Sequence, residues 1–274
     1  MKIILRKKLV ARTGKVKSVD FHPIFNWILL GLYNGSISIY DYNTQSSVQY
    51  LEVTNCPIRS AKFMAEKNYI ICGADDKKIR VYNYNTMEKI KEFEAHEDFI
   101  RSIVCHLKLP MFLSSSDDKT IKLWDVENDF KLIRTYDEHK DYVMKLAINL
   151  KDYSIFASGS TDTTIKIWSF NVDNSQLTLT GHSKGVNTVA FCPLNDKPYL
   201  ASGSDDLLVK IWDYNNKHCL FTFSGHESNL SSVCFHPELP LLITVAEDQL
   251  CKFWNINTGK LEDSKILGYD IVWD

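Results

Sequence analysis

The strongest constraint on the fold is a short block that recurs along the chain at an even spacing. Residues 113–125 read Leu-Ser-Ser-Ser-Asp-Asp-Lys-Thr-Ile-Lys-Leu-Trp-Asp, which predicts a strand, a tight acidic turn and a second, alternating strand. The aromatic residues that close the six copies are Tyr40, Tyr82, Trp124, Trp168, Trp212 and Trp254, at spacings of 42, 42, 44, 44 and 42 residues. Repeats of this period are typical of four-stranded propeller blades. We therefore predict an all-β propeller with six complete blades.

The two ends of the chain look like parts of one further blade. Residues 271–274 have the pattern of an opening strand, and residues 2–11 alternate weakly, as an outer strand would. Closing a ring through the N-terminal strand removes exposed strand edges. We expect a partial seventh blade, as in a truncated seven-bladed propeller, with a modified ring closure as the alternative. No linker interrupts the series, so residues 1–274 are expected to form a single domain.

Composition excludes several classes of protein. Of the 274 residues, 45% are hydrophobic and 12% aromatic, which suffices for a continuous core. A formal net charge of −2 gives no overall attraction to nucleic acid. The seven cysteines form no Cys-x-x-Cys pair, so free thiols in a reducing compartment are expected. No apolar run suits a signal peptide or a membrane span. We expect a cytosolic protein without cofactor or metal.

Polar residues recur inside each repeat. Gly-His or a relic of it precedes four of the repeats, and an Asp stands six residues before the closing aromatic at Asp76, Asp118, Asp162, Asp206 and Asp248. This pattern resembles the WD repeats of the β-propeller family. A His, a Ser or Thr, the turn Asp and the Trp indole can form a hydrogen-bonded tetrad inside a blade, so their expected role is structural. The first two repeats carry Tyr for Trp, and the first has Asn34, so their tetrads should be incomplete. No nucleophile elbow or Gly-rich phosphate loop is present, so we expect no enzyme activity.

Equivalent positions in different repeats should lie on one ring of the propeller. The second residue of each predicted first strand reads Lys17, Arg59, Arg101, Met144, Asn187 and Ser231. The residue before each turn position reads Tyr33, Asp75, Asp117, Thr161, Asp205 and Glu247. Both rings should open on the same face, where a basic arc on the early blades meets acidic positions further round. Such segregation suits a small zwitterionic ligand. The alternative is that these are solvated rim charges, each worth little.

The segments between the repeats carry a more specific resemblance. Matching stretches span essentially the whole chain and comprise residues 9–23, 32–36, 73–76, 80–86, 93–96, 100–102, 196–199 and 235–240. On these residues the chain resembles the β-prime subunit family of the COPI vesicle coat. The resemblance implies a first propeller that binds the C-terminal dilysine signals, KKxx or KxKxx, of endoplasmic-reticulum membrane proteins.

The resemblance also assigns roles to particular residues. Lys15, Lys17 and Arg59 would hold the terminal carboxylate of the signal. Asp98 and Asp117 would take one signal lysine, and Tyr33 would line the groove. Ring position adds Arg101 to the basic arc and Asp205 as the acid for the more upstream lysine. Lys15 stands where the family more often has Arg, which keeps the charge but loses the bidentate fork.

The implied setting is retrograde transport from the Golgi to the endoplasmic reticulum. The expected partners are dilysine tails and other COPI coat subunits, with no nucleic acid and with membrane contact only through the coat. The protein would then be cytoplasmic and peripheral on Golgi membranes and COPI-coated vesicles. The chain lacks the second propeller and helical solenoid of the family, so it is expected to act as a cargo-reading fragment. The alternative is a general WD-repeat scaffold for a folded protein partner.

Overall fold

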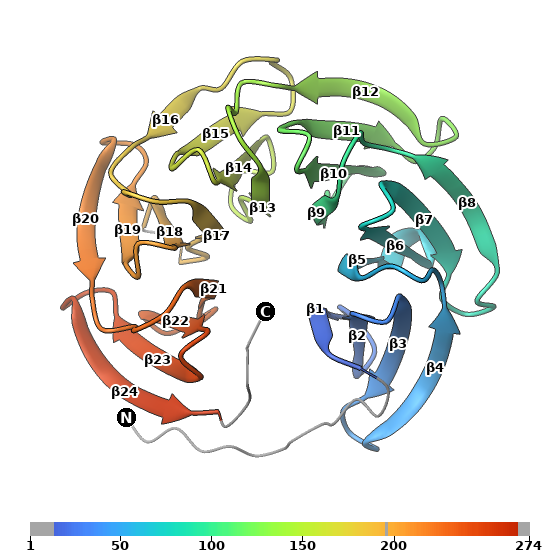
Figure 1. The fold of residues 1–274 in the computed structure, drawn as a ribbon, viewed down its shortest axis with the longest axis horizontal. Coiled ribbons are helices and arrows are strands. Elements are labelled where there is room, and N and C mark those ends of the chain that lie inside the picture. Colours follow the sequence, from blue (N-terminus) through green and yellow to red (C-terminus); the bar gives the residue numbers. More distant parts are fainter. Residues whose placement is uncertain (1–13, 195–196, 268–274) are drawn as a thin grey trace.

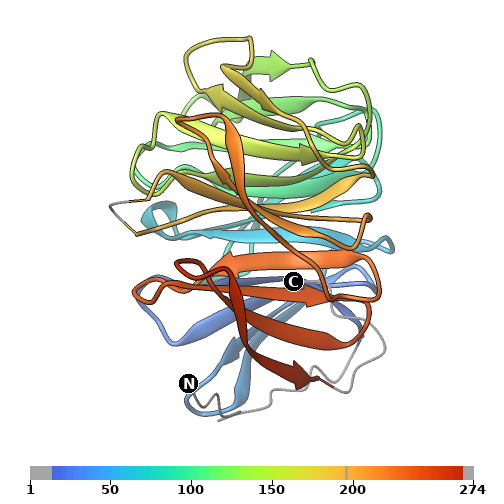
Figure 2. The same ribbon diagram turned by 90° about the vertical axis from the view of Figure 1, so that its left-hand side faces the viewer.

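The computed structural model describes residues 14–194 and 197–267 of the chain. In these residues, six four-stranded antiparallel sheets are arranged as blades around a central channel (Figure 1). Each sheet orders its strands consecutively, with the first strand nearest the channel and the fourth at the circumference. Seen from the side, the connecting loops collect on the two opposite faces of the ring (Figure 2). The six predicted complete blades are confirmed.

The first three blades follow one another from the N-terminal end of the described chain. Blade 1 contains β1 (Val16–Phe21), β2 (Trp27–Leu32), β3 (Ser36–Asp41) and β4 (Ser46–Glu52). Blade 2 contains β5 (Ile58–Met64), β6 (Tyr69–Ala74), β7 (Lys78–Asn83) and β8 (Lys89–Glu94), with the 3₁₀ helix η1 (Ala65–Lys67) between its first two strands. Blade 3 contains β9 (Ile100–Cys105), β10 (Met111–Ser116), β11 (Ile121–Asp125) and β12 (Lys131–Tyr136).

The last three blades repeat the same plan. Blade 4 contains β13 (Val143–Ile148), β14 (Ile155–Ser160), β15 (Ile165–Ser169) and β16 (Leu177–Leu179). Blade 5 contains β17 (Val186–Phe191), β18 (Tyr199–Ser204), β19 (Val209–Asp213) and β20 (His218–Phe223). Blade 6 contains β21 (Leu230–Phe235), β22 (Leu241–Ala246), β23 (Leu250–Asn255) and β24 (Lys260–Ile266).

The core lies between successive blades. Leu29 and Ile37 of blade 1 pack with Ile58 and Ile70 of blade 2 in one buried cluster, and similar clusters join the later blades. A middle strand is therefore covered on both faces, and it reads as a nearly continuous run of buried residues, as in β6. The outermost strand β4 is mostly exposed. Because each blade buries its apolar side chains against the next blade, a single blade of this kind would leave them exposed and would not be stable alone.

Four blades contain the predicted hydrogen-bonded tetrad. In blade 3, His96 bonds Asp118 at 2.8 Å and Ser114 at 2.7 Å, and the indole N–H of Trp124 donates to Ser114 at 2.8 Å. Burial alone would raise the pKa of Asp118, but its bonds to His96 and Thr120 hold that pKa below its ordinary value. Blades 4, 5 and 6 repeat this arrangement around His139, His182 and His226. The structural role predicted for these residues is consistent with their burial.

The first two blades satisfy their polar groups differently, as the sequence predicted. In blade 2, Thr54 takes the place of the His and donates to Asp76 at 2.8 Å, while Arg80 pairs with the same carboxylate at 2.7 Å. In blade 1, the side-chain oxygen of Asn34 accepts the backbone N–H of Ser36 at 3.2 Å. A blade therefore needs its buried polar groups paired, but not by one fixed set of residues.

Each first strand carries an irregularity next to its first residue. The pairing of β1 with β2 skips Lys17, because Val16 lies opposite Leu32 and Ser18 lies opposite Gly31. The same one-residue shift occurs in the other five blades, at Arg59, Arg101, Met144, Asn187 and Ser231. Such β-bulges re-aim a side chain away from the regular alternation of the strand. The ring identified in the sequence is thus the ring of bulged residues.

The expected pieces of a seventh blade, residues 2–11 and 271–274, lie outside the described residues. Across the described ranges, no helix is long and apolar enough to cross a membrane.

Candidate functional site

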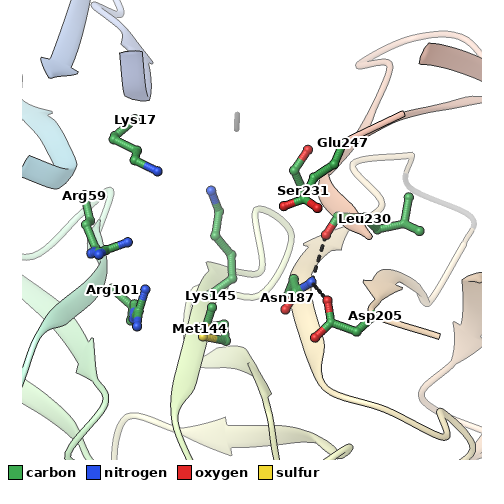
Figure 3. A pocket seen from close by; sticks show the side chains of 10 residues that line it. All are labelled: Lys17, Arg59, Arg101, Met144, Lys145, Asn187, Asp205, Leu230, Ser231 and Glu247. Carbon is green, nitrogen blue, oxygen red and sulfur yellow. Dashed lines mark hydrogen bonds between the residues drawn. The ribbon is translucent and has the colours of Figure 1, made fainter. Parts of the chain in front are cut away.

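The bulged residues converge on a pocket at one mouth of the channel. The pocket has a volume of about 300 Å³. Its lining consists of Lys17, Arg59, Arg101, Met144, Lys145, Asn187, Asp205, Leu230, Ser231 and Glu247 (Figure 3). All six bulged residues belong to this lining, so the bulge in each blade supplies one side chain to a shared site.

Two of the cations are paired within their own blades. The Arg59 guanidinium donates to both oxygens of Asp75, with 2.8 Å between Nη2 and Oδ2. Arg101 makes the same two-pronged contact with Asp117, at 2.6 Å from Nε and 2.5 Å from Nη2. Bidentate pairs of this kind fix the plane of the guanidinium. Arg59 also lies over the ring of Phe99 in blade 3, with its central carbon 5.7 Å from the ring centre.

Blade 1 presents a cation in a different setting. Tyr33 occupies the position that Asp75 and Asp117 have in blades 2 and 3. The Lys17 ammonium lies 5.5 Å from the centre of the Tyr33 ring. Burial, followed by the nearby charge of Arg59, lowers the pKa of Lys17 from its ordinary value of 10.5 to about 8. Arg101 and Lys15 act in the same direction. An anion bound beside Lys17 would offset this crowding of positive charge.

The opposite side of the pocket is acidic and amide-bearing. Asn187 donates to Asp205 at 2.6 Å and to the carbonyl of Leu230 at 3.0 Å. Ser231 donates to the carbonyl of Val245 at 3.2 Å. Figure 3 shows Lys17, Arg59 and Arg101 on one side of the opening, with Asp205 and Glu247 on the other. The pocket therefore has walls of opposite charge on its two sides.

Four of the predicted site residues lie outside the pocket lining. Lys15 and Tyr33 are exposed neighbours, joined by a 2.8 Å bond from the Tyr33 backbone N–H to the Lys15 carbonyl. Asp98 lies in the loop before β9, where its carboxylate accepts the backbone N–H of Phe99 at 2.8 Å. Asp117 is 5% exposed and serves as the partner of Arg101. The first three adjoin the pocket through the loops that lead into and out of its strands.

Three charged or aromatic residues in or beside the pocket were not among the predicted site residues. Glu247 is the blade-6 residue at the position before the turn, the position that Asp205 occupies in blade 5. That equivalence was the sequence signal that could have placed Glu247 in the site. Phe99 precedes a first strand, and its contact with Arg59 crosses from one blade to the next. Lys145 follows a bulged residue and replaces the Ser or Thr found there in the other blades.

The site offers no evident metal centre. In the part of the chain that the structure describes, no group of three or more His, Cys, Asp or Glu side chains is placed to hold a metal ion.

Comparison with known proteins identifies the family. The family model described as "WD domain, G-beta repeat" matches residues 45–83, 87–125, 130–169, 173–213 and 217–255. Over its full length the chain is 47% identical to coatomer subunit beta′ of Rattus norvegicus, and it covers 30% of that protein. Over 57% of the chain, it is 62% identical to the probable coatomer subunit beta′ of Caenorhabditis elegans and 54% identical to that of Homo sapiens, covering 16% and 17% of them. The chain thus spans less than a third of the length of these relatives. It belongs to the WD-repeat family and is a homologue of coatomer subunit beta′.

Proposed function

We propose that this propeller is a non-enzymatic COPI coat module that binds the C-terminal dilysine tails of membrane cargo. The observation that carries the proposal is the pocket itself, in which Lys17 and Arg59 face Asp205 and Glu247 across one mouth of the ring. A dilysine tail has the complementary charges, with a carboxylate at its end and ammonium groups a few residues upstream. The likeness to coatomer subunit beta′ supports the coat assignment.

The terminal carboxylate is assigned to the basic side. Lys17 is the central residue, because burial and neighbouring cations already crowd its ammonium and a bound anion would relieve that cost. Arg59 flanks it, held in orientation by Asp75, and the exposed Lys15 completes the set from the adjoining loop. Charge-assisted hydrogen bonds of this kind contribute about 1.5–3 kcal/mol each.

The signal lysines are assigned to the acids. Asp98 lies in an adjoining loop, and Asp117 can accept an ammonium in addition to Arg101, because a carboxylate offers about four acceptor sites. Tyr33, which is 52% exposed, would line the path of the aliphatic stem. The more upstream lysine would reach Asp205, and Glu247 lies on the same side.

The likeness to coatomer subunit beta′ supports a proposed cellular role. We propose that the protein acts at the cytoplasmic face of Golgi membranes and on COPI-coated vesicles during retrieval to the endoplasmic reticulum. Other coat subunits would be its protein partners, and its contact with membrane would be indirect.

Isothermal titration with a peptide ending in Lys-Lys-Ser-Ser tests the proposal. Binding should weaken at least tenfold when the peptide carries a C-terminal amide, because the basic side loses its anion. Arg59→Gln should weaken binding by a similar factor, and higher salt should also weaken it. The matched control is Lys108→Gln, which removes a charge from an exposed residue after β9, at the opposite face. Equal affinity for the acid and amide peptides would refute the proposal.

A general scaffold is the second candidate, favoured by a specific observation. Apolar side chains are exposed in the loops after the first strands, including Ile24 at 79%, Leu107 and Leu150 at 50% each. These loops lie at the face opposite the pocket. A peptide array separates the two functions, because a scaffold would show no requirement for a free C-terminus.

A further inference from the structure

One blade departs from the others at the residue that follows the bulge. In five of the six described blades this third residue of the first strand bears a hydroxyl, and the five are Ser18, Ser60, Ser102, Thr188 and Ser232. In blade 4 the residue is Lys145.

The hydroxyl at this position connects one blade to the next. Ser18 accepts the backbone N–H of Ala61 at 3.1 Å, and Ser60 accepts that of Ile103 at 2.9 Å. The same link runs from Leu146 to Ser102 at 3.2 Å and from Val233 to Thr188 at 3.3 Å. These bonds hold successive innermost strands at a common height around the channel.

Lys145 cannot make this link, because its side chain has no hydroxyl to accept from Val189, the equivalent residue of blade 5. Its side chain is instead part of the pocket lining, and Figure 3 shows it extending into the open middle between the basic and acidic sides. The other two blade-4 residues on these rings, Met144 and Thr161, are uncharged. Lys145 thus supplies the cation of blade 4 and extends the basic arc from three blades to four.

Lys145 departs from the Ser or Thr that the other repeats carry at this position, and its side chain lines the pocket. Departures of this kind from an otherwise regular pattern are expected at functional sites. We propose that Lys145 is a specificity-determining residue that binds a second carboxylate of the ligand, the side chain of an Asp or Glu at one of the last two positions of the tail. This inference rests on the proposed function.

The geometry favours those two positions. The terminal carboxylate is assigned to Lys17 and Arg59 and the more upstream lysine to Asp205, so the end of the tail passes over the middle of the pocket, where Lys145 lies. A Lys ammonium on a flexible four-carbon stem acts as a point charge and can follow an acidic side chain at either position. A third lysine there would be repelled by the same charge.

The test compares tails that differ in one charge. Peptides ending in Lys-Lys-Ser-Ser, Lys-Lys-Glu-Ser and Lys-Lys-Ser-Glu, each with a free C-terminus, are titrated into the wild-type protein and into Lys145→Ser. The wild type should bind at least one Glu peptide about fivefold to tenfold more tightly than the Ser-Ser peptide, which is less than a buried charge-assisted contact gives because the pocket is open to solvent. Lys145→Ser should remove this preference, so that the three peptides bind to the variant with affinities within about twofold of one another.

The controls separate charge from folding. Lys145→Ser introduces the residue that four other blades already carry, so its melting temperature should equal or exceed that of the wild type. Lys108→Ser removes the same charge at the opposite face and should keep the preference. Lys145→Glu should reverse the preference and favour the Ser-Ser peptide.

Each outcome has a separate meaning. If the wild type binds all three peptides equally, or if the preference survives in Lys145→Ser, the role of Lys145 is refuted and the proposed function stands. If Lys145→Ser binds the Ser-Ser peptide much more tightly, Lys145 acts by repulsion and the inference fails. If no peptide binds the wild type, both the proposed function and the role of Lys145 are refuted.

Discussion

The interior of the blades and the wall of the channel are built from the same six repeats, yet they vary in opposite ways. Inside blades 3 to 6 the same four-residue network recurs with bond lengths between 2.7 and 2.9 Å. Along the channel the bulged position changes from Lys and Arg to Met, Asn and Ser. The contrast teaches that positions closed off by neighbouring strands serve folding, whereas positions turned out of the ladder are available for a ligand.

The largest expected effect on stability comes from removing one residue of the hydrogen-bonded tetrad inside a blade. Asp118→Ala removes the acceptor for His96, for Thr120 and for the backbone N–H of Glu97. Because His96 is buried and would lose its partner, the free energy of unfolding should fall by about 3 kcal/mol. Urea titration measures the change.

The matched control for that variant lies on the pocket face. Asp98→Ala should change the free energy of unfolding by less than about 0.5 kcal/mol, because this carboxylate lies in a loop beside solvent. Similar losses in both variants would contradict the division between interior and channel.

A smaller effect, opposite in sign for stability, is expected at the channel wall. Lys17→Met should weaken binding of a dilysine peptide at least tenfold, by removing the central cation of the proposed site. The same change should raise the free energy of unfolding by on the order of 1 kcal/mol, because Lys17 is held charged in a half-buried, cationic setting. A loss of stability in this variant would refute the interpretation of Lys17 as a residue kept for binding.

Because the pKa of Lys17 is lowered, the free energy of unfolding and the affinity for the peptide should both depend on pH. The folded protein releases this proton near pH 8, whereas the unfolded chain keeps it until about the ordinary value of 10.5. The stability cost of Lys17 is therefore complete below pH 8 and disappears as the pH rises toward 10.5. Peptide binding should weaken as the pH rises above 8, and Lys17→Met should lack that dependence.

The smallest expected effect concerns the link that blade 4 lacks. Lys145→Ser should restore a hydrogen bond to the backbone N–H of Val189 and stabilise the fold by about 0.5–1 kcal/mol. Hydrogen exchange of the Val189 amide should slow relative to the wild type. Unchanged exchange would show that the hydroxyl link is not what positions this strand.

Much of the fold was predictable because its signal is periodic. The even spacing of Tyr40, Tyr82 and the four tryptophans predicted six blades, and the departures at Asn34 and Tyr82 predicted where the tetrads would be incomplete. These features depend on which residue types can fill a buried position and pair its polar groups by hydrogen bonds. Residue types can be read directly from a sequence.

The candidate site was only partly predictable. Ring position placed Lys17, Arg59 and Asp205 on one face, and the structure has all three in the lining of one pocket. It did not reveal that Asp117 pairs with Arg101, because that contact depends on how the bulge turns the guanidinium toward its own blade. Lys145 was missed because the comparison between blades covered the bulged position and the position before each turn, and the informative change lies one residue after the bulge.

The bulge has a consequence for how such a protein can diversify. A bulged residue is skipped by the strand pairing, so replacing its side chain leaves the register of that blade intact. A library randomised at Lys17, Arg59, Arg101, Met144, Asn187 and Ser231 should therefore yield mostly folded proteins with altered ligand preference. The propeller is in this respect a natural template for engineering new receptors, adjustable one blade at a time.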